Sequence, residues 1–498
     1  MMALVVLSTS TLAACSGGGS PDDGGSALAA SDLRIVSLST RAHLVTGGDV
    51  LLRVEVGTDL DASQVEVTSN GDDVTESFRL VAQGAALTGL VQGLRDGDNE
   101  IEARISDGGA STKLQVVNHP ISGPIVSGPH QTPYLCQTEE FTTAGGASLG
   151  APLDVNCSVA TRVEYVYLST LDQEFKPYSS AASAGPPSDV AEATTLDGST
   201  VPFIVRVQTG TVNRAIYQSS MLHDPDDPEP DPWTASRGWN GKLVYTHGGG
   251  CRNGWFRQGA STGAVLQKGL LEMGFAVTSA SLNVFGQNCN DLLASETHIM
   301  VKERFVESYG EPVYTIGTGG SGGSYQSHQT ADNYPGVFDG IIVSSSFPDV
   351  TSATIFTLAD ARLLHHYFTE VAPHEFSKDE QRRISGFGSW GSIANLSRGA
   401  ARIDATYSKH ATPEAQGAEV GLPELEPLRY SASNPEGIRA TVYDHTVNVY
   451  GVDESTGFAA RPLDNYGVQY GLEVLNHGKI TRAQFLALNS DIGGFDAD

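Results

Sequence analysis

Residues 313–333 read VYTIGTGGSGGSYQSHQTADN, and this stretch decides the fold class. Its apolar start, Val313 to Ile316, predicts a β-strand, and Gly323 to Asn333 predicts a helix. Between them, Gly319-Gly320-Ser321-Gly322-Gly323 matches the pattern G-x-S-x-G. A tight turn from strand to helix strains the central serine and projects its hydroxyl beyond the sheet. Ser321 is therefore a candidate nucleophile, and the alternative is a glycine-rich turn without chemistry.

The chain around this turn alternates strands and helices from Lys242 onward. Such alternation predicts a mainly parallel sheet with helices on both faces, which is an α/β architecture. Two further strands are expected upstream, in a loop-rich part of the chain. The predicted strands are 163–168, 203–207, 243–245, 275–279 and 341–343, and the predicted helices are 262–273 and 295–309.

A glycine run follows the strand 243–245, as His247-Gly248-Gly249-Gly250. Attack of Ser321 on an ester carbonyl creates an oxyanion, and backbone N–H donors must already point toward it, which glycine permits. We expect Gly248, Gly249 and Gly322 to supply these N–H groups. The alternative is that the glycines form a flexible loop.

Two segments together carry a family resemblance, Thr246-His247-Gly248-Gly249-Gly250-Cys251 and Gly320-Ser321-Gly322-Gly323-Ser324-Tyr325-Gln326. They are similar to an exported bacterial family of α/β-hydrolases of unknown function, near tannase-type and polyhydroxyalkanoate-depolymerase esterases. The resemblance covers residues 120–498. It implies an α/β-hydrolase fold, ester hydrolysis without a cofactor, Ser321 as the acylated nucleophile, and Gly248 and Gly322 in the oxyanion hole. Such hydrolases place the base after the nucleophile in the chain, so His247 is expected to be structural.

The catalytic acid and base remain unassigned at this stage. After residue 343 almost no strand is predicted that could carry them, and each candidate is expected to be structural. The resemblance implies more sheet beyond the last residues, so we expect a C-terminally incomplete chain that lacks the usual acid and histidine. Asp444 and His445, on an expected extended run, would point to opposite faces. The candidates are Asp349, His365, His366, His374, His410, Asp444, His445 and His477.

Two regions flank this part of the chain. Residues 31–118 show short alternating runs separated by Gly and Asp turns, which predicts an immunoglobulin-like β-sandwich that acts as a spacer or binding module. The region after about residue 350 is mainly helical and is expected to form an insertion or lid. The predicted sandwich strands are 33–38, 50–56, 65–68, 87–90, 100–105 and 112–117; the predicted helices are 354–369, one that begins at Ser377, 464–476 and 481–489, and 440–450 is expected to be a strand or hairpin.

The first 30 residues resemble a bacterial lipoprotein signal followed by a Gly/Ser-rich tether. Leu12-Ala13-Ala14-Cys15 closes a short apolar stretch. The resemblance implies lipid attachment to Cys15, although no Lys or Arg precedes the apolar stretch, and the alternative is a frayed apolar terminus. Export would leave four cysteines for two disulfides, or else four buried thiols. Sequence proximity favours Cys136 with Cys157 and Cys251 with Cys289.

Composition and charge exclude several classes of function. The 30 Lys and Arg against 58 Asp and Glu give a net charge of −28, which repels phosphate backbones and disfavours nucleic acid as a partner. No Lys follows the glycines to bind a phosphate, no spacing predicts a metal site, and the acidic loop 224–232 is expected to be solvated rather than to bind Ca²⁺. Trp233, Trp239 and Trp255 are expected to belong to the core, and the alternative is an aromatic wall near the site.

These expectations favour an exported, lipid-anchored serine carboxylic-ester hydrolase that acts through an acyl-enzyme on a small or polymeric ester, without a cofactor or metal. The alternative from another class is a non-catalytic cell-surface binding lipoprotein with a degenerate hydrolase domain. A peptidase on the same fold is a third, weaker alternative. Neither the identity of the ester nor the oligomeric state can be predicted from these residues.

Overall fold

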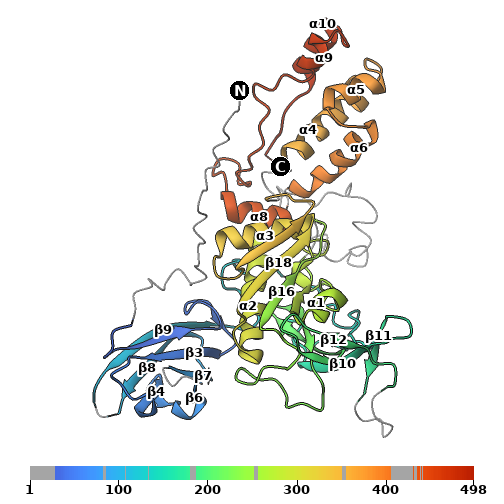
Figure 1. Ribbon diagram of the computed structural model, residues 1–498. Coiled ribbons are helices and arrows are strands. Elements are labelled where there is room, and N and C mark those ends of the chain that lie inside the picture. Colours follow the sequence, from blue (N-terminus) through green and yellow to red (C-terminus); the bar gives the residue numbers. More distant parts are fainter. Residues whose placement is uncertain are drawn as a thin grey trace, which may run out of the picture.

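The computed structural model describes residues 28–81, 86–106, 108–132, 134–179, 187–251, 256–349, 355–404, 430, 434–437, 439 and 441–497. Figure 1 shows a β-sheet unit at the N-terminal side, a central sheet flanked by helices, and a group of helices that projects beyond one end of the central sheet. Cys15, Trp255 and His410 lie outside the described residues. No helix among the described residues is both long enough and apolar enough to span a membrane.

The N-terminal unit consists of two sheets that share one apolar core. Every strand expected in this region is present. Alternate residues of β3, such as Val50, Leu52 and Val54, are fully buried between the sheets, as the sequence alternation predicts. The first sheet has the order β1 (Leu33–Ser37), β3 (Asp49–Val56), β7 (Ala86–Gln92), β6 (Phe78–Leu80), and the second has the order β2 (Val45–Thr46), β9 (Ser111–His119), β8 (Gly97–Ile105), β4 (Val65–Ser69), β5 (Asp72–Asp73).

The central sheet has eight strands. Its first four strands pair antiparallel, β15 also pairs antiparallel with β17, and β17, β16, β18 and β19 pair parallel. The sequence predicted six of these eight strands but missed β11 and the fully buried β15. A separate two-stranded sheet pairs β12 (Glu192–Thr194) with β13 (Thr200–Pro202). The order across the sheet is β11 (Phe175–Tyr178), β10 (Arg162–Leu168), β14 (Ile204–Val212), β15 (Ala215–Leu222), β17 (Ala276–Ala280), β16 (Lys242–Thr246), β18 (Tyr314–Gly320), β19 (Gly340–Ser344).

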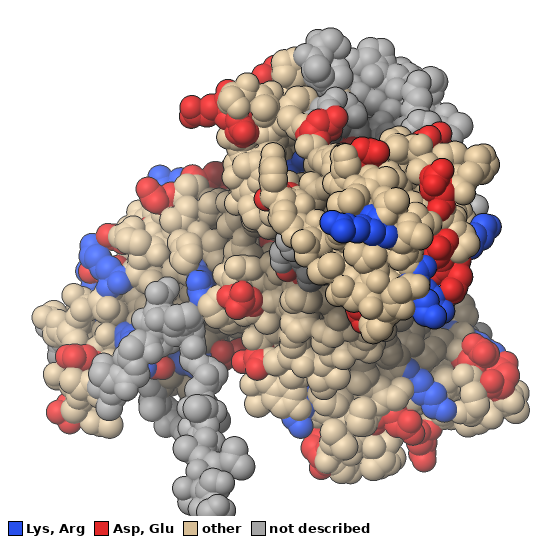
Figure 2. Space-filling model, turned by 90° about the horizontal axis from the view of Figure 1, so that it is seen from above, with Lys and Arg blue, Asp and Glu red and all other residues tan. Residues whose placement is uncertain are grey.

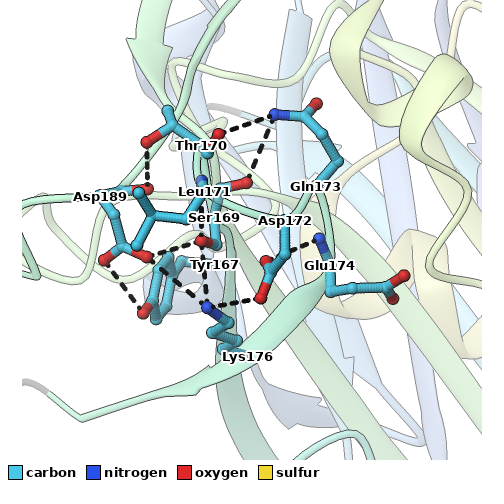
Figure 3. Close-up of polar contacts among 9 residues, drawn as sticks. All are labelled: Tyr167, Ser169, Thr170, Leu171, Asp172, Gln173, Glu174, Lys176 and Asp189. Carbon is cyan, nitrogen blue, oxygen red and sulfur yellow. Dashed lines mark hydrogen bonds and ion pairs between the residues drawn. The ribbon is translucent and has the colours of Figure 1, made fainter.

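The hairpin between β10 and β11 at the far edge of this sheet is held by polar side chains (Figure 3). Lys176 Nζ lies 2.9 Å from Asp172 and donates to Ser169 Oγ at 3.1 Å. Ser169, which is fully buried, donates to Asp189 at 2.6 Å. This serine lies beside a lysine and a carboxylate, but its burial makes the cluster a structural brace.

Three helices pack on the parallel strands: α1 (Lys268–Glu272), α2 (Asp291–Tyr309) and α3 (Gly322–Asn333). The expected helix 262–273 is wrong for its first half. Gly263 N–H donates to Ser279 Oγ at 2.8 Å and Thr262 Oγ1 donates to Gln218 at 2.8 Å, so neighbouring strands hold this segment as a loop. The 3-10 turn 281–283 follows β17.

The C-terminal region is helical, with a core of its own around Leu364, Tyr367 and Leu488. The capping boxes at Ser377 and Thr481 form as predicted. The expected helix 464–476 is shortened to its last turn because Gly467 and Gly471 adopt positive φ. The helices are α4 (Ile355–His366), continued by a π-helical turn (Tyr367–Val371), α5 (Lys378–Ser385), α6 (Trp390–Gly399), α8 (Thr441–Tyr450), α9 (Leu472–Asn476) and α10 (Arg482–Asp491), with a 3-10 turn at Ala400–Ile403.

Helix α8 corrects the expectation of a strand or hairpin at 440–450. Residues 441–446 are all buried, and Val442 packs against Phe285 and Tyr325 while Tyr443 packs against Tyr430. This packing overrides the strand preference of the β-branched residues in this segment.

Helix α2 also contacts the N-terminal unit. Glu303 of α2 is buried and accepts a hydrogen bond from Thr46 N–H at 2.8 Å. Arg53 of β3 pairs with Glu311 at 2.8 Å just beyond the helix. Glu296, fully buried, accepts the N–H groups of residues 125–127 at 2.7 to 2.8 Å and so fixes the connection between the two units.

Two disulfides, Cys136–Cys157 and Cys251–Cys289, join the four cysteines as sequence proximity predicted. Disulfides of this kind fit an extracellular protein. Figure 2 shows Asp and Glu side chains spread over the face seen from above and interspersed with Lys and Arg, without one continuous basic surface.

Candidate functional site

Ser321 lies where β18 ends and α3 begins. Its backbone adopts φ 56° and ψ −118°, a left-handed conformation that side-chain-bearing residues rarely occupy. The Ser321 N–H donates to the carbonyl of Ser344 at the end of β19 at 3.1 Å, and its own carbonyl accepts the Ser324 hydroxyl at 2.6 Å. The residue is exposed. The strand, strained serine and helix therefore have the arrangement that the sequence predicted.

The glycines around Ser321 are required by close backbone contacts. A Cβ on Gly319 would lie 2.9 Å from the Cβ of His247, and one on Gly322 would lie 1.7 Å from the carbonyl oxygen of Gly250. The loop 247–250 is thus packed directly on the first turn of α3. Side chains at these positions would separate the loop from the serine.

The three expected oxyanion donors differ in whether their N–H groups are already hydrogen-bonded within the protein. Gly248 N–H donates to the carbonyl of Asn283 at 2.9 Å, so in this structure it is not available to a ligand, which corrects the expectation for Gly248. Gly249 is exposed, and a Cβ built on it would lie 3.9 Å from the Cβ of Ser321. No described residue accepts the N–H of Gly249 or of Gly322, and Gly322 is the first residue of α3, where the helix dipole favours an anion.

His247 lies beneath the loop rather than in the site. Its ring is buried, its Nδ1 is 2.8 Å from Ser327 Oγ, and burial lowers its pKa to about 3. The ring packs against Tyr245 and against His298, whose pKa burial also lowers well below its ordinary value. Both imidazoles are therefore neutral at physiological pH, and neither carries a charge into the site.

The other histidine and acid candidates are scattered. His365 packs its ring against Trp390, and His366, His374 and His477 are exposed in the helical region. Because Thr441–Tyr450 is a helix, Asp444 and His445 do not face opposite sides of a strand. Instead Asp444 pairs with Arg439 at 2.9 Å, and His445 Nε2 lies 3.2 Å from Asp291 Oδ2 at the start of α2, both side chains buried. Among the described residues, no histidine hydrogen-bonds to Ser321 Oγ.

The two described tryptophans do not form an aromatic wall near the site, and Trp239 has the core position that the sequence favoured. Trp239 packs edge-on against Phe305 in the core. The Trp233 indole N–H donates to the carbonyl of Thr88 at 3.1 Å, and Arg79 lies 4.1 Å above its ring, so Trp233 belongs to the contact with the N-terminal unit.

The acidic loop forms ion pairs with nearby arginines, and one cavity opens in the N-terminal unit. Glu229 of this loop pairs with Arg206 at 3.1 Å and Asp227 with Arg237 at 2.8 Å. No cluster of three or more His, Cys, Asp or Glu among the described residues could hold a metal ion. A cavity of about 520 Å³ opens beside Leu33 and Ser111 of the N-terminal unit, and no residue that lines it belongs to the site.

Sequence reasoning missed the residues that support the site. Gln326 and Asn283, both fully buried, lie beneath the glycine loop, and His328 Nε2 is 2.8 Å from Ser346 Oγ in the loop after β19. Polar residues on the helix after the nucleophile, at 326–328, were the available signal. Their partners lie 18 to 80 residues away in the chain, so only the fold brings them together.

Among the comparisons with known proteins, a family model covers most of the chain. The model of a tannase-like family of unknown function matches residues 35–498. The solved structures include tannin acyl hydrolase from Aspergillus niger, with 12% identity over 66% of this chain and 60% of that chain and a TM-score of 0.26. Oligopeptidase B from Trypanosoma brucei with covalently bound antipain matches at 10% identity over 66% of this chain and 50% of that chain, with a TM-score of 0.20. Bovine butyrophilin matches at 10% identity over 38% of this chain and 91% of that chain, with a TM-score of 0.14. No curated protein matches. Scores this low do not establish a shared fold.

Proposed function

Because the chain belongs to the tannase-like family of unknown function, we propose that it is a serine carboxylic-ester hydrolase that acts through an acyl-enzyme. The observation that carries the proposal is the conformation of Ser321, at φ 56° between β18 and α3, with the exposed Gly249 beside it. A strained serine above the ends of parallel strands presents its hydroxyl to a substrate rather than to the protein.

The chemistry uses the nucleophile and the N–H donors that the site holds in place, together with a base that no described histidine provides through a hydrogen bond to Ser321 Oγ. Ser321 Oγ bonds to the ester carbonyl carbon, its proton passes through a base to the departing alcohol, and the C–O ester bond breaks. The negative charge on the former carbonyl oxygen is stabilised by the N–H groups of Gly249 and Gly322, which replaces the expected role of Gly248. Water then attacks the acyl-enzyme, releases the acid and restores the serine hydroxyl.

The same proposal includes an α/β-hydrolase fold for the central sheet. The supporting observations are the four parallel strands β17, β16, β18 and β19, the nucleophile after β18, and helices packed on both faces. We extend the proposal to an immunoglobulin-like sandwich at the N-terminal side and to an exported, lipid-anchored chain that acts on an extracellular ester or polyester. Support for export comes from the two disulfides.

The experiment that tests the function is labelling of the purified chain with a fluorophosphonate, followed by peptide mapping. We expect rapid labelling of Ser321 and none of Ser455, an exposed serine in an ordinary turn whose hydroxyl donates to Asp453. Ser321→Ala should abolish labelling and ester hydrolysis, whereas Ser455→Ala should leave both unchanged.

Failure of a folded chain to react would refute the esterase and leave the second candidate, a cell-surface binding protein with a degenerate hydrolase domain. That candidate is favoured by one observation, that no described histidine hydrogen-bonds to Ser321 Oγ. Hydrolysis that survives Ser321→Ala would refute the assignment of the nucleophile.

A further inference from the structure

Gln326 joins the nucleophile helix to the glycine loop. It lies on α3 five residues after Ser321 and is fully buried. Its Nε2 donates to the carbonyl of Gly248 at 3.1 Å and, more weakly, to the carbonyl of Gly322 at 3.4 Å. One side-chain amide therefore contacts the backbone on both sides of the site.

A buried network fixes the orientation of this amide. Gln326 Oε1 accepts from Asn283 Nδ2 at 3.4 Å, and Asn283 Oδ1 accepts from the hydroxyl of Tyr245 at 2.6 Å. Asn283 also accepts the N–H of Gly248 through its own carbonyl at 2.9 Å. All three side chains are shielded from water, so an amide turned the wrong way would leave polar atoms unpaired.

The hydrogen bond at the Gly248 carbonyl determines where the next N–H points. In a trans peptide the C=O and the following N–H lie in one plane and point in opposite directions. With the Gly248 oxygen held by Gln326 and by Phe285 N–H at 3.3 Å, the Gly249 N–H is directed away from the buried network. Gly249 O accepts from Gly286 N–H at 2.8 Å, which fixes the following peptide in the same way.

We propose that Gln326 is a positioning residue that ties the Gly248–Gly249 peptide to the nucleophile helix and so sets the distance between the oxyanion donor and Ser321. This inference rests on the proposed esterase function. Phe285 holds the loop only to the turn after β17, whereas Gln326 holds it to the element that carries the nucleophile. Loss of Gln326 allows the peptide to rotate or the loop to shift without unfolding the sheet.

The test compares three variants by the rate and concentration dependence of fluorophosphonate labelling and by hydrogen exchange of the amides of Gly248 and Gly286. Gln326→Met keeps the length of the side chain and removes the donor. Gln326→Glu keeps an acceptor for Asn283 and loses the donor to Gly248, and it serves if the first variant fails to fold. Asn333→Ala, at the exposed far end of α3, removes an amide that bonds only to Gln329 of its own helix.

We expect both Gln326 variants to label about 10- to 100-fold more slowly at saturating probe, with little change in the half-saturating concentration, because the donor acts on the transition state. The Gly248 and Gly286 amides should exchange faster, and Asn333→Ala should match the wild type in both measurements. A purely structural residue would lower the folded fraction without this separation of rate from binding.

Wild-type labelling rates in both Gln326 variants would overturn the inference, as would unchanged exchange of the two amides. A wild-type chain that resists the probe would instead refute the proposed function and with it the catalytic consequence. The exchange measurement then still decides whether Gln326 ties the loop.

Discussion

Replacement of Glu303 by Gln should remove much of the pH dependence of the contact between the N-terminal unit and α2. Glu303 is 1% exposed, and its carboxylate accepts from both the N–H and the hydroxyl of Thr46. Burial, opposed by these hydrogen bonds, raises the pKa of Glu303 from 4.5 to about 8. Burial and the nearby charges of Glu303 and Asp49 also raise the pKa of Glu307 well above its ordinary value.

The sign follows from proton binding. Between pH 4.5 and 8 the folded state keeps the Glu303 proton while the unfolded chain releases it, so folding binds a proton and stability falls as the pH rises. The contribution is fully present below pH 4.5 and is lost once the pH passes about 8. Each unit of difference between the folded and unfolded pKa of Glu303 corresponds to about 1.36 kcal/mol. The free energy of unfolding therefore falls by at most about 5 kcal/mol over this pH range.

The assay is urea unfolding, followed by tryptophan fluorescence, at pH 5, 7 and 9. Glu303→Gln should match the wild type at pH 5 and exceed it by a few kcal/mol at pH 9, because an amide carries no charge to bury. Glu311→Gln, which removes an exposed carboxylate paired with Arg53 near the same contact, should keep the wild-type slope. Equal slopes for Glu303→Gln and the wild type would refute the reasoning.

Three further predictions concern the site and the disulfides. Ser321→Gly should raise the free energy of unfolding by about 1 kcal/mol while it abolishes labelling, because glycine tolerates φ 56°; a variant less stable than Ser321→Ala in urea would contradict this. Gly322→Ala should lower the free energy of unfolding by about 2 kcal/mol or more in the same assay, because its Cβ would meet the carbonyl of Gly250. As a control, Gly269→Ala, which has open space around it in α1, should raise the free energy of unfolding by about 0.5 to 1 kcal/mol. Replacement of Cys251 and Cys289 by Ser should lower the free energy of unfolding by about 4 kcal/mol, and replacement of Cys136 and Cys157 by about 3 kcal/mol, because the disulfides join residues 38 and 21 positions apart. The opposite order in urea unfolding would contradict this argument from loop length.

Local patterns predicted much of this fold. The strands of the N-terminal unit follow from alternation and Gly turns, and the turn at Ser321 follows from a strand, small residues and a helix. The capping boxes at Ser377 and Thr481 also formed as the sequence indicated. These features depend on neighbours in the chain, which a sequence displays directly.

The errors arose where distant contacts decide the structure. Helix α8 is rich in β-branched residues, which favour a strand, yet burial against Phe285 and Tyr325 makes it helical. Gly248 appeared free in the sequence, but parallel pairing with the segment after β17 occupies its N–H. Trp233 lies close in the chain to β16, the strand that leads into the glycine loop, but in space it lies against Thr88. All of these partners are distant in the chain, so the periodicity of the sequence cannot predict them.

Helix α2 connects the two halves of the molecule mechanically. Its 19 residues span about 28 Å. At its start Asn290 caps the helix next to Cys289, whose disulfide partner Cys251 follows the glycine loop. Two thirds of the way along the helix, Glu303 accepts a hydrogen bond from Thr46. The N-terminal unit is therefore attached to the same helix whose first turn lies next to the loop of Gly249. The placement of the N-terminal unit and the geometry of the proposed site therefore depend on the same helix.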